Sequence, residues 1–198
     1  TTAPIIANIT VTPVYTYNGV SCTGTSSTFS ITVNPRATVN AVANQTVCNG
    51  NSTAAINFSS GFTGGSIVYN WVNNDPSIGL AASGAGNIAS FTAANAGTAP
   101  VTATITVTPT YTSNAVSCVG TSSTFTITVS PTASVDPVAD ETLCANQVTT
   151  PIVFTSPVSG TIYNWVNNNP SIGLAARGTG NIPSFTTANN LSIASSAV

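Results

Sequence analysis

The sequence has almost no charged residues. Among 198 residues there are only two basic and four acidic side chains, with no histidine. Both basic residues are arginines, so lysine is absent too. An average soluble domain is about 25% charged. A net charge of −2 gives no electrostatic basis for binding nucleic acid or an anionic membrane. We therefore expect no nucleic-acid partner.

The absence of histidine and lysine also removes most of the usual catalytic groups. There is no imidazole base, no Schiff-base amine and no possibility of a Ser–His–Asp triad within these residues. The glycine-rich sequence Gly84-Ala85-Gly86 lacks the lysine of a phosphate-binding loop, so we interpret it as a turn. We expect a protein that is not an enzyme and that binds no cofactor.

Long hydrophobic runs are missing as well. No stretch of 18 apolar residues occurs, so no membrane span is expected in this segment. The chain is nevertheless 42% apolar and is rich in Thr, Ser and Asn. Intrinsic disorder usually combines high charge with low hydrophobicity, and this chain has neither property. The composition favours a folded protein.

A long internal repeat is the dominant feature that is present. Residues 2–35 and 98–131 are identical at 25 of 34 aligned positions. Residues 70–88 return, nearly unchanged, as residues 164–182. A fixed long period indicates an array of equivalent units. One period, about 96 residues, is enough to bury a hydrophobic core.

The frame of the repeat divides the chain into three segments. Residues 1–35 match the C-terminal part of a unit, residues 36–131 form one complete unit, and residues 132–198 match the N-terminal part of the next. The chain contains no methionine. We expect it to begin and end inside units and to belong to a longer tandem protein.

The complete unit shows the period-2 pattern of β-strands and no convincing helix. Apolar residues alternate with threonine at 101–108 and 124–129, and shorter alternations occur at 54–58 and 69–71. Turn-rich stretches separate these runs, at 49–53, 61–65, 73–76, 83–87 and 113–123. This spacing predicts an all-β fold, a β-sandwich in each unit. Pro13 and Pro109 interrupt strand-like runs, and we expect the strand to bulge or end at each.

Several motifs resemble a known family. Tyr69-x-Trp71 and Tyr163-x-Trp165 resemble the Tyr-x-Trp of strand C in PKD-type immunoglobulin-like domains. Together with TVCNG, NWVNNxPSIGLAA, GNIxSFTA and TATITVTPTY, they resemble the PKD-like repeats of very large surface proteins of gliding bacteria. Val72-Asn73-Asn74-Asp75 stands where Asp-Phe-Gly-Asp-Gly is usual, and residues 54–58 lack the cysteine of antibody domains.

The resemblance implies tandem immunoglobulin-like β-sandwiches exported by the type IX secretion system to the cell surface. The implied function is a structural segment of a long extracellular adhesin or filament, with a possible role in gliding motility. The implied partners are neighbouring repeats, other copies of the filament and surface polysaccharide. Two alternatives use the same scaffold: a carbohydrate- or surface-binding module, and a spacer in a secreted enzyme whose catalytic domain lies elsewhere.

The four cysteines follow the repeat, since Cys22 matches Cys118 and Cys48 matches Cys144. Their spacing and the lack of histidine argue against zinc and favour disulfides in an oxidising, extracellular setting. One alternative is a bridge within a unit, between its two cysteines. The other joins consecutive units, and the partner of Cys48 would then lie beyond residue 198. Both alternatives stay open at this point.

The aromatic and acidic residues have simple structural interpretations. Tyr69 and Trp71 share a strand face, as do Tyr163 and Trp165, and we expect all four in the core rather than at a ligand site. Asp136, Asp140 and Glu141 could suggest calcium. However, the equivalent positions of the preceding unit hold Asn40, Asn44 and Gln45, so we expect a solvated acidic patch and no metal site.

Overall fold

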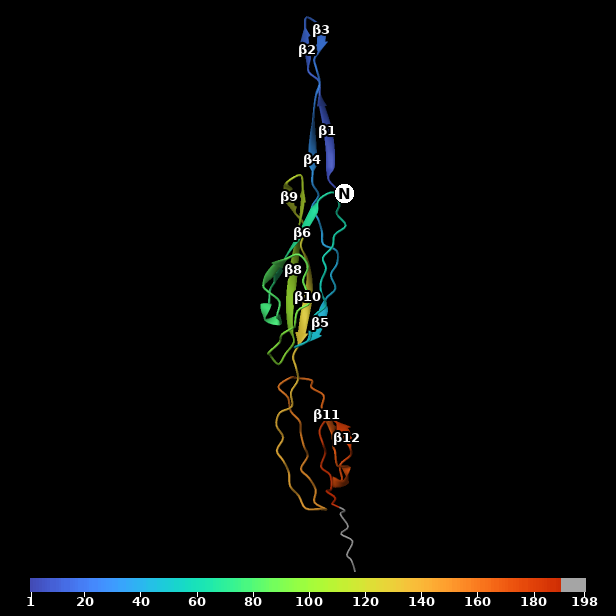
Figure 1. The fold of residues 1–198 in the computed structure, drawn as a ribbon, viewed down its shortest axis with the longest axis vertical. Helices are drawn as coiled ribbons and strands as arrows, with labels where there is room; N and C mark the ends of the chain where they lie inside the picture. Colours follow the sequence, from blue (N-terminus) through green and yellow to red (C-terminus); the bar gives the residue numbers. More distant parts are fainter. Residues whose placement is uncertain (190–198) are drawn as a thin grey trace, which may run out of the picture. The chain divides into compact units, whose positions relative to one another are not determined.

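The computed structural model describes residues 1–189, and its regular structure is nearly all β, arranged in several separate sheets (Figure 1). By internal contacts the chain divides into two compact units. The first contains Thr1–Asn95 and Pro100–Ser130, and the second contains Ala96–Ala99 and the chain from Pro131 onward. No helix among the described residues is long and apolar enough to cross a membrane.

The N-terminal segment is a long two-stranded hairpin. Strand β1 (Ile5–Val11) pairs antiparallel with β4 (Ser27–Val33), and the hairpin continues as β2 (Val14–Tyr17) and β3 (Val20–Thr23). Asn18 and Gly19 form its turn with φ of 43° and 78°, values that suit this dipeptide in a tight hairpin. Both faces of the hairpin are largely exposed, including Phe29, Ile31 and Val33.

The middle segment forms the largest sheet, in the order β5-β10-β8-β6-β7 with β9 paired to β8 (Figure 1). Its strands are β5 (Gln45–Cys48), β6 (Ser66–Asn73), β7 (Ser83–Ala85), β8 (Val101–Ser113), β9 (Val116–Val119) and β10 (Ser123–Ser130). All pairs are antiparallel except β5 with β10, which is parallel.

The core of the middle segment lies on one face of this sheet. The alternating apolar residues of β8 and β10 are almost fully buried there, as their period-2 pattern predicts. Trp71 from β6 and Ile56, Ile78 and Ile88 from the connecting segments cover them. The outward positions of β8 and β10 carry threonine, whose β-branched side chain favours strands.

Pro13 and Pro109 each lie at a break in a hairpin ladder, where the N–H of Gly24 or Gly120 donates to the proline carbonyl at 2.8 Å. At Pro13 the strand ends, as predicted, because β1 stops at Val11 and β2 starts at Val14. At Pro109 the strand does not end, because β8 stays paired with β6 as far as Thr112, but the ladder along its other edge shifts by one residue there, as in a β-bulge. On one edge β8 changes partner there: Val107 pairs with β10 and Thr110 with β9. A residue without an N–H is tolerated at this break in the ladder.

Other local expectations also need correction. Residues 54–58 form one isolated bridge, Ile56 to Ile88, instead of a strand. Ser83–Ala85, expected as a turn, forms β7 beside β6. A single turn of 3-10 helix, η1 (Pro76–Ile78), follows Asp75, whose carboxylate accepts the N–H of Ser77 at 3.1 Å.

The C-terminal segment contains two short strands, β11 (Asn164–Val166) and β12 (Arg177–Thr179), and the 3-10 turn η2 (Pro170–Ile172). The two strands pair with each other. Among residues 132–189 the remainder is irregular chain joined by two isolated bridges, Val148 to Thr186 and Ile152 to Ile182. Residues 132–189 therefore contain little regular sheet.

Candidate functional site: an open apolar groove

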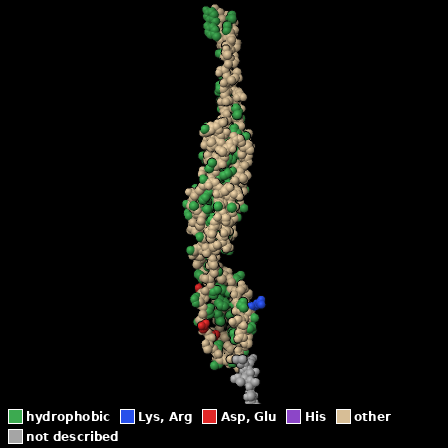
Figure 2. Space-filling view, in the orientation of Figure 1, with side chains coloured by type: hydrophobic (Ala, Val, Ile, Leu, Met, Phe, Trp, Pro, Cys, Tyr) green, Lys and Arg blue, Asp and Glu red, His purple; other side chains and the backbone are tan. Residues whose placement is uncertain are grey.

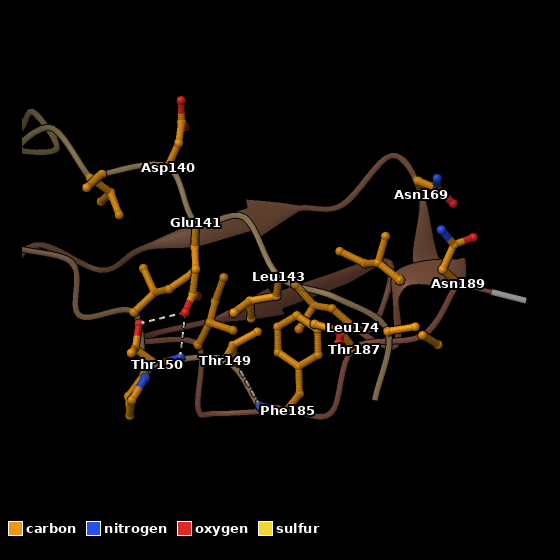
Figure 3. Close-up of a pocket in the computed structure, with 18 of the residues that line it drawn as sticks. Asp140, Glu141, Leu143, Thr149, Thr150, Asn169, Leu174, Phe185, Thr187 and Asn189 are labelled. Carbon is orange, nitrogen blue, oxygen red and sulfur yellow. Dashed lines mark hydrogen bonds between the residues drawn. The ribbon is translucent and has the colours of Figure 1, made fainter. Parts of the chain in front are cut away.

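An open groove of about 1070 Å³ lies within the C-terminal segment (Figure 3). Leu143, Leu174, Ile182 and Phe185 contribute its apolar lining. In the space-filling view, hydrophobic side chains gather over this segment, with acidic side chains beside them (Figure 2). A second, smaller hollow of about 400 Å³ in the same segment is lined by residues that include Tyr163 and Trp165.

Several hydrogen bonds in the walls of the groove match hydrogen bonds of the middle segment. The N–H of Ile56 donates to the carbonyl of Ile88 at 2.8 Å, and the N–H of Ile152 donates to that of Ile182 at 2.9 Å. Asn73 and Asn167 each donate from Nδ2 to a leucine carbonyl at 3.0 Å. The matching sequences of the two segments thus form matching hydrogen bonds, and we call the set of connecting segments that they join the frame of each segment.

The two frames differ in what fills them. In the middle segment β8 and β10 lie against the frame, and Ile78 is fully buried. In the C-terminal segment no described strand takes their place, and the matching residue, Ile172, is 40% exposed. The groove is therefore the space that two core strands occupy in the preceding segment.

The groove has a polar margin. Asp140, Glu141 and Asn189 lie there (Figure 3). Glu141 accepts the N–H of Thr150 at 3.1 Å, just as Gln45 accepts the N–H of Ala54 at 2.9 Å. The described residues contain no cluster of three or more side chains of the His, Cys, Asp and Glu types that could hold a metal ion.

The predicted core aromatics lie in both frames. Trp71 is 7% exposed and belongs to the core, with Tyr69 packed at its edge. Trp165 and Tyr163 take the matching places in the C-terminal segment but are only half-buried. Burial of the Tyr69 hydroxyl raises its pKa above the ordinary value of 10.0, and a hydrogen bond with Ser60 opposes part of that rise.

The cysteines are separate free thiols in this structure. Cys48 pairs with Ser130 at one end of β10, whereas Cys118 pairs with Tyr111 near the far end of β8. Val101 of β8 pairs with Val129, so about ten residues of strand, roughly 33 Å, separate the two cysteines. A disulfide spans at most about 7 Å between Cα atoms. The within-unit pairing is not formed here, and pairing between units stays a prediction.

Sequence reasoning missed the groove. The match of residues 164–182 to residues 70–88, which pack against β8 and β10 in the middle segment, was the signal that could have found its lining. The pattern of individual residues gives no such signal, since the lining residues match buried core positions. In comparisons with known proteins, no protein-family model matches this chain, and no curated protein matches it.

Proposed function

We propose that this chain is a non-catalytic structural segment of a long extracellular surface protein, an adhesin or filament that carries tension along its length. The observation that carries this proposal is the direction of two strands in the middle segment. Strand β5, near the start of the segment, runs parallel to β10 at its end.

Parallel pairing gives this strand pair a favourable geometry under load. Thr38 also bridges Thr121 in the parallel sense, and the N–H of Thr121 donates to the carbonyl of Ala37 at 3.0 Å. The chain therefore enters the middle segment at one end of the β5–β10 pair and leaves it at the opposite end. Tension applied at residues 36 and 131 loads these hydrogen bonds together, in shear, instead of breaking them one after another.

Two further observations support the proposal. The sequence repeats with a long period, and units linked in series make an extended molecule. The motifs of the Tyr69-x-Trp71 region resemble PKD-like repeats, and on that resemblance the proposal includes immunoglobulin-like β-sandwich units, type IX export and a cell-surface location. The buried core of the middle segment gives each such unit its own stability.

Single-molecule pulling on the 198-residue chain tests this function. With handles at residues 36 and 131, we expect one cooperative unfolding event that releases roughly 300 Å, from about 96 residues at 3.3–3.6 Å each. As the matched control, handles at Thr38 and Thr121 grip the same end of the strand pair and peel it apart. We expect a distinctly lower force in the control. Equal forces in the two geometries would remove the support for a load-bearing role.

Binding assays separate the load-bearing function from the alternative of a carbohydrate-binding module. A carbohydrate-binding module would show saturable glycan binding by the chain in an array or by calorimetry. A load-bearing segment is expected to show the difference in force without such binding.

A further inference from the structure

We propose that the middle segment binds both strands at the base of the β1–β4 hairpin, which belongs to the preceding repeat, so that the two are connected by a stiff joint with two attachment points. The joint lies within the first compact unit of the structure, where residues 1–35 meet the middle segment. The inference concerns contacts inside the chain, and it does not require the load-bearing role proposed above.

The first argument is the short covalent link. Strand β4 ends at Val33, and Ala37 is already fully buried in the middle segment, where its carbonyl accepts the N–H of Thr121 at 3.0 Å. Only residues 34–36 lie between β4 and this anchor, and they lack the glycine and serine typical of flexible linkers. Pro35 fixes its own φ and disfavours helical backbone at the residue before it. The link therefore has little freedom to bend.

The second argument is the contact made by Asn34, immediately after β4. Its side-chain amide donates from Nδ2 to the carbonyl of Ser113 at 3.0 Å and to the carbonyl of Val116 at 3.3 Å. These two residues pair with each other and flank the turn between β8 and β9. An amide nitrogen carries two hydrogens, so both are used here. The end of β4 is thus bonded to both arms of a hairpin in the middle segment.

The turn that Asn34 spans has a backbone conformation that costs free energy. Asn114 and Ala115 have φ of 50° and 59°. Asparagine tolerates this left-handed region, but alanine rarely adopts it. The matching turn of the preceding repeat, Asn18-Gly19, has glycine at the second position and avoids the cost. The amide of Asn34 bridges the two residues that flank the strained turn and so opposes its opening.

The third argument is a separate attachment at the other strand of the hairpin. The N–H of Thr63 donates at 2.8 Å to the carbonyl of Thr2, near the start of β1. Pro4 lies against Gly64, where an added Cβ would be 3.0 Å from the Pro4 Cδ. Because β1 and β4 are paired, residues 2 and 34 stand at the two bases of one hairpin. Contacts at both bases oppose rotation of the hairpin about the covalent link.

The loop of the second attachment is itself fixed to the hairpin of the first. Tyr111, fully buried in β8, donates from its hydroxyl to the carbonyl of Thr63 at 2.9 Å. The hydroxyl of Ser113 donates to the carbonyl of Gly64 at 3.3 Å. A Cβ at Gly65 would lie only 2.6 Å from the ring of Tyr111, so the loop and the ring are in close contact. The two attachment points therefore belong to one connected structure.

The same pattern recurs one repeat later. Residues 98–100 and Pro131 repeat the Thr-Ala-Pro of residues 2–4 and the proline at position 35. Ala96–Ala99 belongs to the second compact unit together with the chain from Pro131 onward, although strand β8, in the first compact unit, begins shortly after it. The residues before β8 and after β10 thus both associate with the segment that follows.

Disulfide trapping in the full chain tests the joint. With the four native cysteines replaced by serine, Thr2→Cys and Thr63→Cys are expected to form an intrachain disulfide, because hydrogen-bonded backbone neighbours lie about 5.5 Å apart between Cα atoms. Equilibration with a glutathione redox buffer gives the effective concentration of one thiol at the other. In the control, Ser52→Cys replaces Thr63→Cys. Ser52 is exposed and lies close to the Cys48 end of β5, so we expect no such disulfide.

A variant of Asn34 shows whether the two attachments act together. Asn34→Asp keeps the shape of the side chain but replaces the donor with an oxygen that repels the two carbonyls. We expect the effective concentration between positions 2 and 63 to fall at least about ten-fold, the usual effect of leaving buried polar groups unpaired. Asn8→Asp is the matched control, because it makes the same change at an exposed position of β1. We expect it to stay within about two-fold of the parent, as surface substitutions do.

Spin labels measure the stiffness of the joint. Labels at Thr10→Cys and Ala85→Cys, in the same cysteine-free chain, lie at exposed positions outside the joint. Pulsed electron paramagnetic resonance is expected to give a narrow distribution of distances between them. The distribution is expected to broaden when Asn34→Asp is added, while circular dichroism shows that the middle segment stays folded.

Two results would overturn the proposal. One is an effective concentration between positions 2 and 63 no higher than that of the Ser52→Cys control. The other is an Asn34→Asp chain whose effective concentration and distance distribution both equal those of the parent. Either result would mean that the β1–β4 hairpin is tethered to the middle segment only through residues 34–36.

Discussion

Cys48 lies opposite Ser130 in the parallel register of β5 and β10. Neighbouring strands run about 4.8 Å apart, within the range that a disulfide can span. This neighbour relation predicts that a disulfide can be engineered within the middle segment.

The Ser130→Cys variant is expected to form a disulfide with Cys48 of the same chain when the other three cysteines are replaced by serine. Non-reducing electrophoresis and mass spectrometry of the linked peptides would detect it. Thr126→Cys is the matched control, because four residues of strand place it roughly 13 Å from Cys48. Equal cross-linking from positions 126 and 130 would contradict the parallel register of β5 and β10.

Ile127 and Ile31 form a pair of identical residues in equivalent strands with different burial. Ile127→Ala is expected to lower the free energy of unfolding of the middle segment by about 2–5 kcal/mol, because it leaves a cavity in a closed core. Ile31→Ala is expected to change it by less than about 0.5 kcal/mol, because that side chain is half exposed. Urea titration at a dilution where the chain is monomeric measures both. Comparable losses would mean that the hairpin already belongs to a closed core.

Gly84 lies beneath the indole of Trp71. A Cβ at position 84 would overlap the ring carbons Cζ2, Cε2 and Cη2 of Trp71. Gly84→Ala is therefore expected to destabilise the middle segment by about 1–3 kcal/mol through overpacking. Gly61→Ala is the control, since no atom lies within 4 Å of its added Cβ. Thermal unfolding followed by circular dichroism compares them, and equal stability of the two variants would contradict the packing argument.

Tyr69 predicts a loss of stability at alkaline pH. Its pKa in the folded chain is raised by burial, so the folded state holds the phenol proton more tightly than the unfolded state does. The stabilisation is fully present below pH 10.0, the unfolded value, and is lost as the pH rises through the folded pKa. Tyr69→Phe is expected to show a shallower decline in unfolding free energy above pH 10. If the unfolding free energy of Tyr69→Phe declines as steeply as that of the parent chain, groups other than Tyr69 cause the loss of stability.

Much of the β structure could be predicted from local pattern. The alternation of threonine with Val, Ile and Phe at 101–108 and 124–129 predicts β8 and β10, because side chains of a strand point alternately to its two faces. The same pattern predicts which residues of these strands are buried.

Local pattern did not predict which segments complete the sheet. Residues 54–58 alternate like a strand yet form one bridge, and Ser83–Ala85 has turn-like composition yet pairs with β6. In both places the hydrogen-bond partner decides the outcome, and that partner is distant in sequence. The groove belongs to the same class of feature, because it depends on the absence of two strands from a frame.

The clearest division between sequence and tertiary structure is seen in two nearly identical tetrapeptides. By itself, the sequence determines the apolar alternation, the turn at Asn18-Gly19 and the side chains that suit a core. It does not determine whether Gln-Thr-Val-Cys or Glu-Thr-Leu-Cys becomes a strand. Gln45–Cys48 is a strand because β10 lies beside it and pairs with its backbone. Residues 141–144 have no described strand beside them and remain irregular, since a strand exists only where a neighbour completes its ladder of hydrogen bonds.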